Sequence, residues 1–422
     1  MEQTYVVHYS EVALKGKNRP EFARALARNV SRALYGFDAS VRQGDSRIFV
    51  QTGAEEGEVL RRLSKVFGVS WLAKASSVPP EFSAVSTEVL SQARSLSGST
   101  FRITARRSDK SFAMTSKEVE EKLGSEVVAA TGNSVSLSRP DTNVHVDLLK
   151  GRALVYSSRV RGPGGLPVGT AGRVIHLFSG GIDSPVAAWL LMKRGCRPVY
   201  LHFFAAPNPE APLDGKVGKL VRILSQSGGR CTLLLVPFAE YQLATLGKAT
   251  GSLEPSLFRR FMRMSAELLA PAFGASALST GDSLSQAASQ TIWNLRTFDD
   301  GCTFPVLRPL LTYDKEEIVD LAKLIGTYDV SLEEYKDCCS IVSSHPKTRA
   351  KGGDVSELAT RLGFAELARK SFGRGTLVGY DPSRGKTKVA PLGEVLERAA
   401  LEISARGAAP TQEKAQVSIE PL

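Results

Sequence analysis

The chain has 422 residues, of which 42% are hydrophobic and 23% are charged, and its formal net charge is +11. This length and apolar content predict two to four globular domains and exclude a collagen-like or wholly disordered chain. No apolar run reaches the roughly 18–20 residues that span a bilayer, and the first residues lack the basic-then-apolar pattern of a secretory signal. Five cysteines exclude a disulfide framework, so we predict a soluble cytoplasmic protein with reduced thiols.

The basic surplus is the unusual feature of this composition. Lys and Arg number 54 against 43 Asp and Glu, and residues 1–172 carry +7 of the +11. Such a surplus raises the expectation of a nucleic-acid partner, although charge alone leaves a basic enzyme without one equally open.

The first half predicts a small α+β architecture of alternating strands and helices. A β-rich segment at 5–9 precedes a basic, glycine-containing loop at 14–20, and apolar residues then recur at helical spacing (Phe22, Leu26, Val30). Further strands are predicted at 47–50, 101–107, 144–148 and 152–156. Further helices are predicted at 58–67 and from 115 to about 124, where Gly124 is the expected stop.

Two segments predict boundaries, and the pattern changes after the second. One is the Ser/Pro-rich stretch 75–81, and the other is 161–169, with four glycines and two prolines. Beyond it, near-continuous apolar strands alternate with helical patterns, which favours a doubly wound parallel sheet. The predicted strands lie at 174–178, 198–204, 233–236, 277–280 and 306–307. The polar tail after about residue 405 shows no periodicity and is expected to fray.

The segment Ser179-Gly180-Gly181-Ile182-Asp183-Ser184 joins the first of these strands to a helix predicted at 185–193. Adjacent glycines permit positive φ and a close approach of the backbone to a ligand. Successive amides and the positive end of the helix could then hold an anion, for which pyrophosphate is the natural candidate. A tight turn without a ligand is the alternative interpretation, but strand, Ser-Gly-Gly-x-Asp-Ser and helix together favour the phosphate site. The pattern is neither a Walker A loop nor a dinucleotide-binding Gly-x-Gly-x-x-Gly.

This loop resembles the PP-loop of the ATP-pyrophosphatase superfamily, whose members cleave ATP between the α and β phosphates and adenylate a carbonyl oxygen. Over roughly residues 5–350, ordered blocks resemble the tRNA 4-thiouridine synthetase (tRNA sulfurtransferase) family. The blocks are Leu14–Arg19, Gly164–Thr170, Ser179–Ala187, Gly281–Leu284, Ala288–Thr291, Arg308–Leu310, Asp314–Ile318, Ile325–Tyr328 and Asp337–Cys339.

The resemblance implies an α/β protein with N-terminal α+β domains ahead of a doubly wound, adenine nucleotide alpha hydrolase-like domain. These would be a ferredoxin-like domain at 1–75, an RNA-binding THUMP domain at 76–165 and the PP-loop domain at 173–350. Residues 351–422 remain as a C-terminal extension with a tail expected to be disordered. They are too few for the rhodanese-like domain that some members append, and they contain no cysteine.

The implied activity is 4-thiouridine formation at position 8 of tRNA, using ATP with Mg²⁺ and a persulfide sulfur. Some members also supply sulfur for thiamine thiazole synthesis. The ATP site would comprise Leu177, Phe178, Ser179, Gly180, Gly181, Asp183, Ser184, His202, Phe203, Arg259, Arg260, Gly281 and Gln290. Plain core packing is the alternative for the apolar members, and a solvated helix face is the alternative for the arginines. Asp183 is also the candidate to organise magnesium through pyrophosphate.

Two further residues carry implied catalytic roles. Lys315 corresponds to a lysine that the family needs, and a surface lysine at a helix start is its alternative. Cys338 is the candidate sulfur carrier, because a thiolate or persulfide is the reactive form of cysteine. A small buried hydrophobic residue is the usual alternative for a lone cysteine. The thiol that resolves the intermediate stays open among Cys339, Cys302, Cys231, Cys196 and an external thiol.

The expected partners are tRNA and a separate sulfur donor, either a persulfide protein such as a cysteine desulfurase or inorganic sulfide. The candidate RNA-binding residues are Lys15, Lys17, Arg19, Arg102, Arg106, Arg107 and Lys110, each of which could equally be a plain surface charge. No membrane partner is expected, and a homodimer is kept as a candidate oligomeric state. Two rival functions remain: a PP-loop enzyme that serves a nitrogen nucleophile, and a non-catalytic RNA-binding protein.

Overall fold

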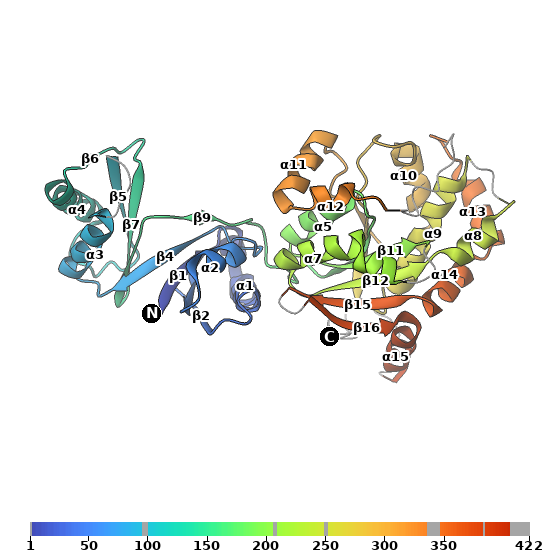
Figure 1. The fold of residues 1–422 in the computed structure, drawn as a ribbon, viewed down its shortest axis with the longest axis horizontal. Coiled ribbons are helices and arrows are strands. Elements are labelled where there is room, and N and C mark those ends of the chain that lie inside the picture. The colour runs from blue at the N-terminus through green and yellow to red at the C-terminus, as the bar shows by residue number, and fades with distance from the viewer. Residues whose placement is uncertain are drawn as a thin grey trace. The chain divides into compact units, whose positions relative to one another are not determined.

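The computed structural model describes residues 2–94, 100–205, 209–248, 252–335, 347–382 and 385–405. It divides into two compact units, unit 1 (Met1–Leu166) and unit 2 (Pro167–Leu422) (Figure 1).

Unit 1 is built on one mixed sheet in the order β2-β3-β1-β4-β8-β7-β5-β6, with β9 paired to β4. Its strands are β1 (Gln3–His8), β2 (Ala39–Gly44), β3 (Arg47–Thr52), β4 (Trp71–Val78), β5 (Thr100–Arg107), β6 (Ser134–Val135), β7 (Thr142–Leu149), β8 (Arg152–Tyr156) and β9 (Val160–Arg161). Its α-helices are α1 (Arg19–Ala33), α2 (Glu56–Leu63), α3 (Phe82–Arg94) and α4 (Ser116–Thr131), and two short 3₁₀ turns, η1 (Glu11–Leu14) and η2 (Gly16–Asn18), precede α1.

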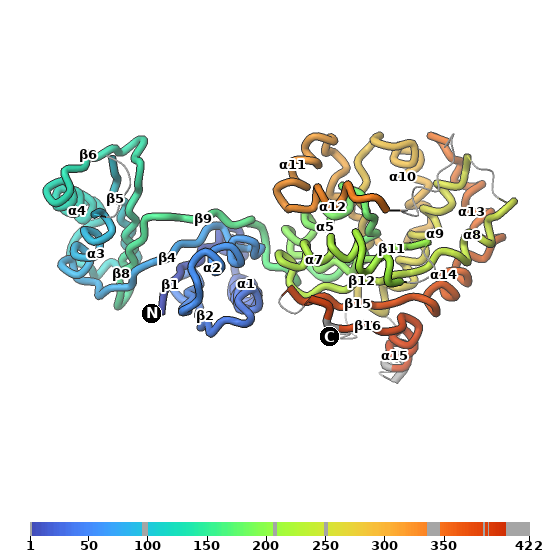
Figure 2. Tube along the Cα trace, in the orientation of Figure 1, coloured from blue at the N-terminus to red at the C-terminus, as the bar shows by residue number. Residues whose placement is uncertain are grey.

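Strand β4 connects the two halves of this sheet, as the chain trace in Figure 2 shows. Residues 71–75 pair with β1, and residues 76–78 pair with β8. The boundary predicted after residue 75 therefore falls inside a continuous strand. The pairing partner of β4 changes from β1 to β8 at this same place.

Helix α4 corrects the predicted stop at Gly124. The helix continues to Thr131 and ends at Gly132, which has φ 72°. Gly124 is buried within the helix, and Val127 one turn later packs into the core, so burial of the second half outweighs the glycine's low helix propensity. Only the C-terminal glycine uses the left-handed backbone that favours this residue.

A buried ion pair lies between strands of the two halves of unit 1. Arg47 on β3 donates to Asp147 on β7 at 2.6 Å, and both side chains are less than a tenth exposed. Tyr156 donates a second hydrogen bond to the same carboxylate. The surrounding apolar cluster includes Phe49 and Leu149, so each charge depends on its partner for compensation.

Unit 2 contains a seven-stranded sheet in the order β14-β13-β10-β11-β12-β15-β16. Its strands are β10 (Arg173–Leu177), β11 (Arg197–Phe204), β12 (Cys231–Pro237), β13 (Ala275–Ser279), β14 (Val306–Leu307), β15 (Thr376–Asp381) and β16 (Gly385–Pro391). The first five run parallel, which confirms the predicted doubly wound sheet. Strands β15 and β16 add an antiparallel edge, so residues assigned from sequence to a separate extension complete this sheet instead.

Helices cover the sheet in two groups (Figure 1). Helices α5 (Asp183–Lys193), α7 (Lys216–Gly228), α11 (Lys315–Ile325) and α12 (Tyr328–Leu332) contact one another, as do α8 (Ala239–Thr245), α9 (Glu254–Leu269), α10 (Ile292–Asp299), α13 (Gly352–Arg361) and α14 (Phe364–Gly373). The remaining helices are α6 (Glu210–Asp214), α15 (Leu392–Ala405) and the 3₁₀ turn η3 (Ala288–Gln290). Within the described residues, no helix is long and apolar enough to cross a membrane.

We predict that Asp147→Asn lowers the free energy of unfolding of unit 1 by about 3–5 kcal/mol, because it leaves the Arg47 guanidinium buried without a countercharge. Urea denaturation measures the change. Glu121→Gln is the matched control, since its pair with Lys117 is exposed and contributes about 0.5 kcal/mol or less. Equal effects of the two substitutions would contradict the stabilising role of the buried pair.

Candidate functional site

The Ser179–Ser184 loop lies where the strand order of unit 2 reverses. It follows β10, whose parallel neighbours are β11 on one side and β13 on the other. Loops at the carboxyl ends of such strands form the usual ligand crevice of a doubly wound sheet. Helix α5 begins at Asp183, two residues before Pro185, and so places its first turn at this crevice.

Two serine side chains close the loop on itself. The Ser184 hydroxyl donates to the carbonyl of Ser179 at 2.8 Å and accepts from the amide of Ser179 at 2.9 Å. The amide of Gly181 donates to the Ser179 hydroxyl at 3.3 Å. These bonds hold the loop in one conformation, and they occupy two of the amides that the sequence analysis offered to an anion.

The loop glycines serve close packing, and neither adopts the positive φ that the sequence suggested. A Cβ on Gly180 would lie 3.3 Å from the Lys216 side chain and 3.4 Å from the Tyr335 ring. The tightest constraint comes from the opposite strand, because a Cβ on Gly281 would lie 2.9 Å from Cα of Ser184. The backbone after β13 therefore touches the backbone of the loop after β10.

A buried histidine on β10 contacts the end of the loop. His176 donates from Nε2 to the carbonyl of Ser184 at 2.9 Å, which leaves Nδ1 to accept from the Ser279 hydroxyl at 3.2 Å. The second bond needs the neutral ring, because Nδ1 accepts only while it carries no proton. Burial lowers the pKa of His176 to about 4, so this neutral form persists at physiological pH.

A cavity of about 420 Å³ opens beside the loop. Its apolar wall includes Leu201, Phe238, Phe258 and Met262, which the sequence analysis did not single out. The residues predicted for the site that line it are Leu177, Phe178, Ser179, Asp183, Ser184, Phe203, Arg259, Gly281 and Gln290. The buried Oε1 of Gln290 has no hydrogen-bond partner among the described residues, which leaves an acceptor for a ligand's N–H group.

Arg259 and Arg260 lie in different environments. Arg259 lines the cavity and makes two hydrogen bonds to Asp282, at 2.9 and 2.8 Å. Arg260 does not line the cavity; it donates to the carbonyl of Asp300 and to the Ser356 hydroxyl. The two side chains leave α9 about 100° apart, and the structure directs Arg259 to the cavity and Arg260 away from it.

Asp282 is a site residue that the sequence reasoning missed. Burial opposes its ionisation, but Arg259, Thr280 and Arg308 outweigh that effect and lower the pKa of Asp282 to about 2. Arg308 also pairs with Asp299 at 2.6 Å, which extends the network to α10. The signal in the sequence was the position of Asp282 just after β13, at the ligand-binding edge of the sheet.

Asp183 and Lys315 meet in the structure, although 132 residues separate them. Lys315 donates to one carboxylate oxygen of Asp183 at 2.7 Å, and Gln286 donates to the other at 2.8 Å. Among the described residues, no cluster of three or more His, Cys, Asp or Glu side chains could hold a metal ion. Asp183 is thus the one carboxylate that the Ser179–Ser184 loop itself contributes.

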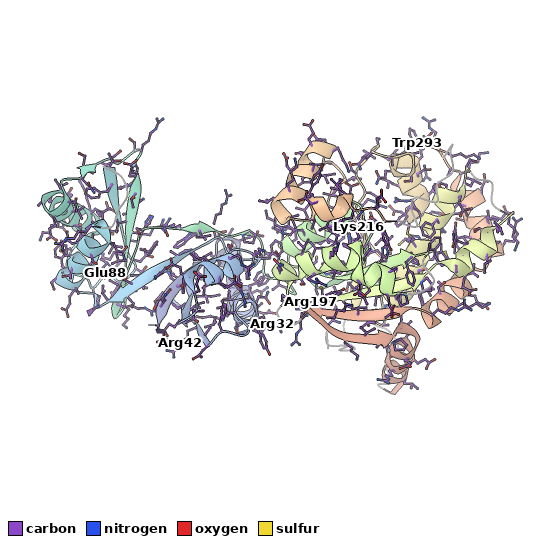
Figure 3. The ribbon with its side chains drawn as sticks, in the orientation of Figure 1. Arg32, Arg42, Glu88, Arg197, Lys216 and Trp293 are labelled. Atoms are coloured by element: carbon purple, nitrogen blue, oxygen red, sulfur yellow. The ribbon has the colours of Figure 1, made fainter. Side chains whose placement is uncertain are left out.

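His202 lies behind the cavity wall and contacts the chain that leads to Cys338. It donates from Nδ1 to the carbonyl of Phe178 at 2.8 Å, so Nε2 accepts from the Tyr335 hydroxyl at 2.9 Å. Lys216, labelled in Figure 3, donates to the carbonyl of Glu333 at 3.0 Å. Residues 333–335 are therefore held over Gly180. Cys338 and Cys339 lie outside the described residues.

The candidate RNA-binding residues of unit 1 differ in their contacts. Lys17 and Arg106 are exposed, as is Lys110. Arg102 and Arg107 donate to backbone carbonyls of unit 1, and Lys15 and Arg19 lie over the rings of Phe22 and Tyr9.

The sequence reasoning overlooked an aromatic and basic cluster on the same sheet. The guanidinium of Arg159 lies 4.3 Å from the Trp71 ring centroid, and the His8 ring stacks on Trp71 with their centroids 4.5 Å apart. Arg159 also lies 2.9 Å from Nδ1 of His145. Burial, followed by the charge of Arg159, lowers the pKa of His145 to about 4. Strand pairing assembles this cluster from distant segments, so no local pattern marks it.

Three family models match successive parts of the chain. The ThiI ferredoxin-like domain matches residues 4–73, the THUMP domain matches residues 83–158, and ThiI, a thiamine biosynthesis protein, matches residues 169–364. Together with the sheet order and the phosphate loop, they define a PP-loop protein that carries ferredoxin-like and THUMP domains ahead of its PP-loop domain.

Relatives and solved structures agree with this class. The probable tRNA sulfurtransferase of Moorella thermoacetica is 36% identical over 385 residues, covering 90% of this chain and 99% of that protein. The probable tRNA sulfurtransferase of Thermus thermophilus is 41% identical over 362 residues, covering 85% and 89%. A 4-thiouridine synthetase, solved with RNA and bound ATP, superposes with a TM-score of 0.81 at 32% identity, covering 90% of this chain and 100% of that one. The chain belongs to the tRNA sulfurtransferase family.

We predict that Gly281→Ala weakens ATP binding by about fivefold or more, because the added methyl group meets backbone that cannot rotate away from it. Equilibrium titration with ATP measures the effect. Gly353→Ala on α13 is the matched control, since a Cβ there meets no atom within 4 Å. Unchanged ATP affinity in Gly281→Ala would show that the contact does not shape the site.

We predict that the stability of unit 2 falls between pH 6.5 and 4. His176 has a lower pKa in the folded chain than in the unfolded chain, so the unfolded chain binds more protons in this range. The stabilisation is complete above about pH 6.5 and declines by roughly 3 kcal/mol as the pH approaches 4. Denaturation across this range should show a flatter profile for His176→Gln. Parallel profiles would contradict the assignment.

Proposed function

We propose that the protein is an ATP-dependent tRNA sulfurtransferase that makes 4-thiouridine at position 8 of tRNA. The uridine O4 attacks the α phosphorus of ATP, and pyrophosphate leaves. The outer sulfur of the Cys338 persulfide then attacks C4, and AMP leaves with the former O4, so that a disulfide links Cys338 to C4. A thiolate next attacks the Cys338 sulfur and breaks this S–S bond, which leaves the outer sulfur on C4 and joins the thiol and Cys338 in a new disulfide. The nucleotide thereby exchanges one oxygen for sulfur, and the activated oxygen departs with a good leaving group.

The observation that carries the proposal is the closed phosphate loop at the switch point of the sheet, beside a cavity that suits ATP. The apolar wall can cover a purine, and the unpartnered Oε1 of Gln290 can accept from an exocyclic amine. The loop and Arg259 lie along the same cavity, where phosphates would meet amides and a guanidinium. The ATP-bound relative supports this assignment.

We assign Asp183 and Lys315 to the phosphate end of the site. Mg²⁺ commonly binds through one or two carboxylates together with substrate phosphates. The Asp183 carboxylate of the loop therefore suffices as the protein's ligand to the ion. When bound, this ion would neutralise charge on the departing pyrophosphate. Lys315 holds Asp183 in place through their 2.7 Å contact, and it supplies a second cation near the loop.

Unit 1 is proposed to bind tRNA through its basic surface. Lys17, Arg106 and Lys110 are exposed, as phosphate contacts require. Arg159 and Trp71 add a guanidinium and an indole, which can stack on unpaired bases. The relative that was solved with RNA supports a tRNA substrate.

Cys338 is proposed as the sulfur carrier, loaded as a persulfide by a cysteine desulfurase, whereas inorganic sulfide as the donor would attack the adenylated C4 directly. The described cysteines are poor candidates for the thiol that resolves the intermediate. Burial raises the pKa of Cys196 and Cys302, and it raises that of Cys231 to about 12, which suppresses the thiolate. Cys196 precedes β11 and Cys231 opens β12, so both lie at the sheet edge opposite the phosphate loop. Cys339 or an external thiol fits this step better.

A second role follows from the name of the matching family model, thiamine biosynthesis protein. We propose that the persulfide on Cys338 can also supply sulfur to thiazole synthesis. This transfer would use the sulfur-carrying segment without the tRNA surface of unit 1.

The decisive experiment incubates the full chain with unmodified tRNA, ATP, Mg²⁺ and either sulfide or a persulfide-loaded desulfurase, followed by nucleoside analysis. We expect 4-thiouridine at position 8 together with stoichiometric AMP. If AMP accumulated only with ammonia and no 4-thiouridine formed with either sulfur source, the rival enzyme with a nitrogen nucleophile would be correct.

We predict that Cys338→Ser lowers thiolation from a persulfide-loaded desulfurase at least a hundredfold and leaves tRNA adenylation intact, because activation precedes sulfur transfer. Release of labelled pyrophosphate measures adenylation independently of sulfur. Cys302→Ser is the control and should retain both activities, since its thiol donates to the carbonyl of Phe304 and does not line the cavity. Loss of adenylation in Cys338→Ser would place Cys338 in the activation step instead.

A further inference from the structure

An exposed aromatic and basic surface lies beside the nucleotide cavity of unit 2. Trp293 and Ile292 begin α10 and are 48% and 62% exposed. Figure 3 shows Trp293 at the surface of this unit. The guanidinium of Arg349 lies 3.9 Å from the Trp293 ring centroid. Large exposed side chains of this kind, next to a site, mark a binding surface more often than a structural need.

The surface is basic as well as aromatic. The exposed cations around Trp293 on α10 and on the segment 347–351 are Arg296, Lys347, Arg349 and Lys351. We call Trp293 and these four residues the Trp293 platform. Its combination of an indole, a stacked guanidinium and further cations matches the chemistry of unpaired RNA, whose bases stack on aromatic or guanidinium planes while cations contact the phosphates.

Hydrogen bonds from α10 hold the platform rigid. Asn294, only 4% exposed, donates to the carbonyl of Lys347 at 2.9 Å and accepts from the amide of Ala350 at 2.9 Å. Thr291 donates to the carbonyl of Thr348 at 2.6 Å. The two segments are therefore fixed against each other, so Arg349 meets Trp293 without the entropic cost of ordering a free loop.

The platform is adjacent to the proposed reaction site. Trp293 follows Gln290 by three residues, which limits the separation of their Cα atoms to about 11 Å. Phe298, on the same helix as Trp293, lines the cavity. Asn294 also donates to the carbonyl of Ala288, another lining residue, at 2.7 Å. A base that leaves its stack to reach ATP in the cavity would therefore bring its neighbours over α10.

We propose that the Trp293 platform binds an unstacked nucleotide of the tRNA beside the target uridine. The base stacks on the free face of the indole or on the outer plane of the Arg349 guanidinium, and the surrounding cations contact the flanking phosphates. The inference rests on the proposed tRNA function and adds a contact in unit 2, separate from the RNA surface of unit 1.

The test compares Trp293→Ala, Trp293→Phe and Arg349→Ala in the full chain. Loss of one base–aromatic stack corresponds to about fivefold weaker binding or more. We therefore expect Trp293→Ala to weaken tRNA binding and to lower sulfide-driven kcat/KM for thiolation by about fivefold. Trp293→Phe should retain most of both because it keeps an aromatic face, and Arg349→Ala should show an intermediate loss.

Two controls separate this contact from general damage. ATP affinity should stay within about twofold in all three variants, because none of the substituted side chains lines the cavity. Leu401→Ala removes another exposed apolar side chain of unit 2, 71% exposed on α15, and should change neither tRNA binding nor turnover. Quenching of tryptophan fluorescence by tRNA should be smaller in Trp293→Phe than in the wild type.

Three outcomes decide the proposal. Unchanged tRNA affinity and unchanged sulfide-driven turnover in Trp293→Ala would overturn it. If only turnover with a persulfide-loaded protein donor fell, the surface would bind that protein and the RNA proposal would be wrong. If the wild type made no 4-thiouridine and Trp293→Ala still lost tRNA affinity, the platform would stand and the proposed reaction would fall.

Discussion

The close contact between Gly281 and the backbone of Ser184 is the constraint on which the candidate site depends. It brings the loop after β13 against the loop after β10, two strands that are neighbours only through the reversed strand order. The segment that begins at Gly281 then supplies Asp282 to Arg259, Gln286 to Asp183 and the unpartnered oxygen of Gln290 to the cavity. A side chain at position 281 would separate the two loops and disturb all three contacts together.

Burial determines which charges the site can keep. His176 is enclosed without a countercharge in hydrogen-bond contact and therefore stays neutral, and in that form its two ring nitrogens contact β13 and the first turn of α5. Asp282 is equally enclosed but stays ionised, because it meets two guanidinium groups. Arg259 is consequently oriented before any ligand arrives. This preorganisation reduces the entropy that nucleotide binding would otherwise cost.

In unit 1, strand pairing and a buried ion pair stabilise one continuous sheet instead of a pocket. Strand β4 belongs to both halves of the sheet, and the Arg47–Asp147 pair lies within the apolar cluster between them. A broad basic surface suits an RNA that is recognised by shape, because phosphate contacts need positive charge over a fixed framework more than they need a pocket. The proposed Trp293 platform differs from this surface, because it offers a single stacking position beside the nucleotide cavity of unit 2.

The sequence by itself determined the five parallel strands, because near-continuous apolar runs are a local pattern, and the loop between strand and helix is a contiguous motif. The candidate residues Arg259, Gln290 and Lys315 came from the resemblance to a known family. It could not separate Arg259 from Arg260, since their directions depend on how α9 packs against the sheet. It also placed a helix stop at Gly124, and it separated β15 and β16 from the sheet that they complete. Only the tertiary structure joined Asp183 to Lys315 and Gly281 to Ser184. Such contacts join segments that are far apart in the chain, and strand order and burial, not local preference, decide which of those segments meet.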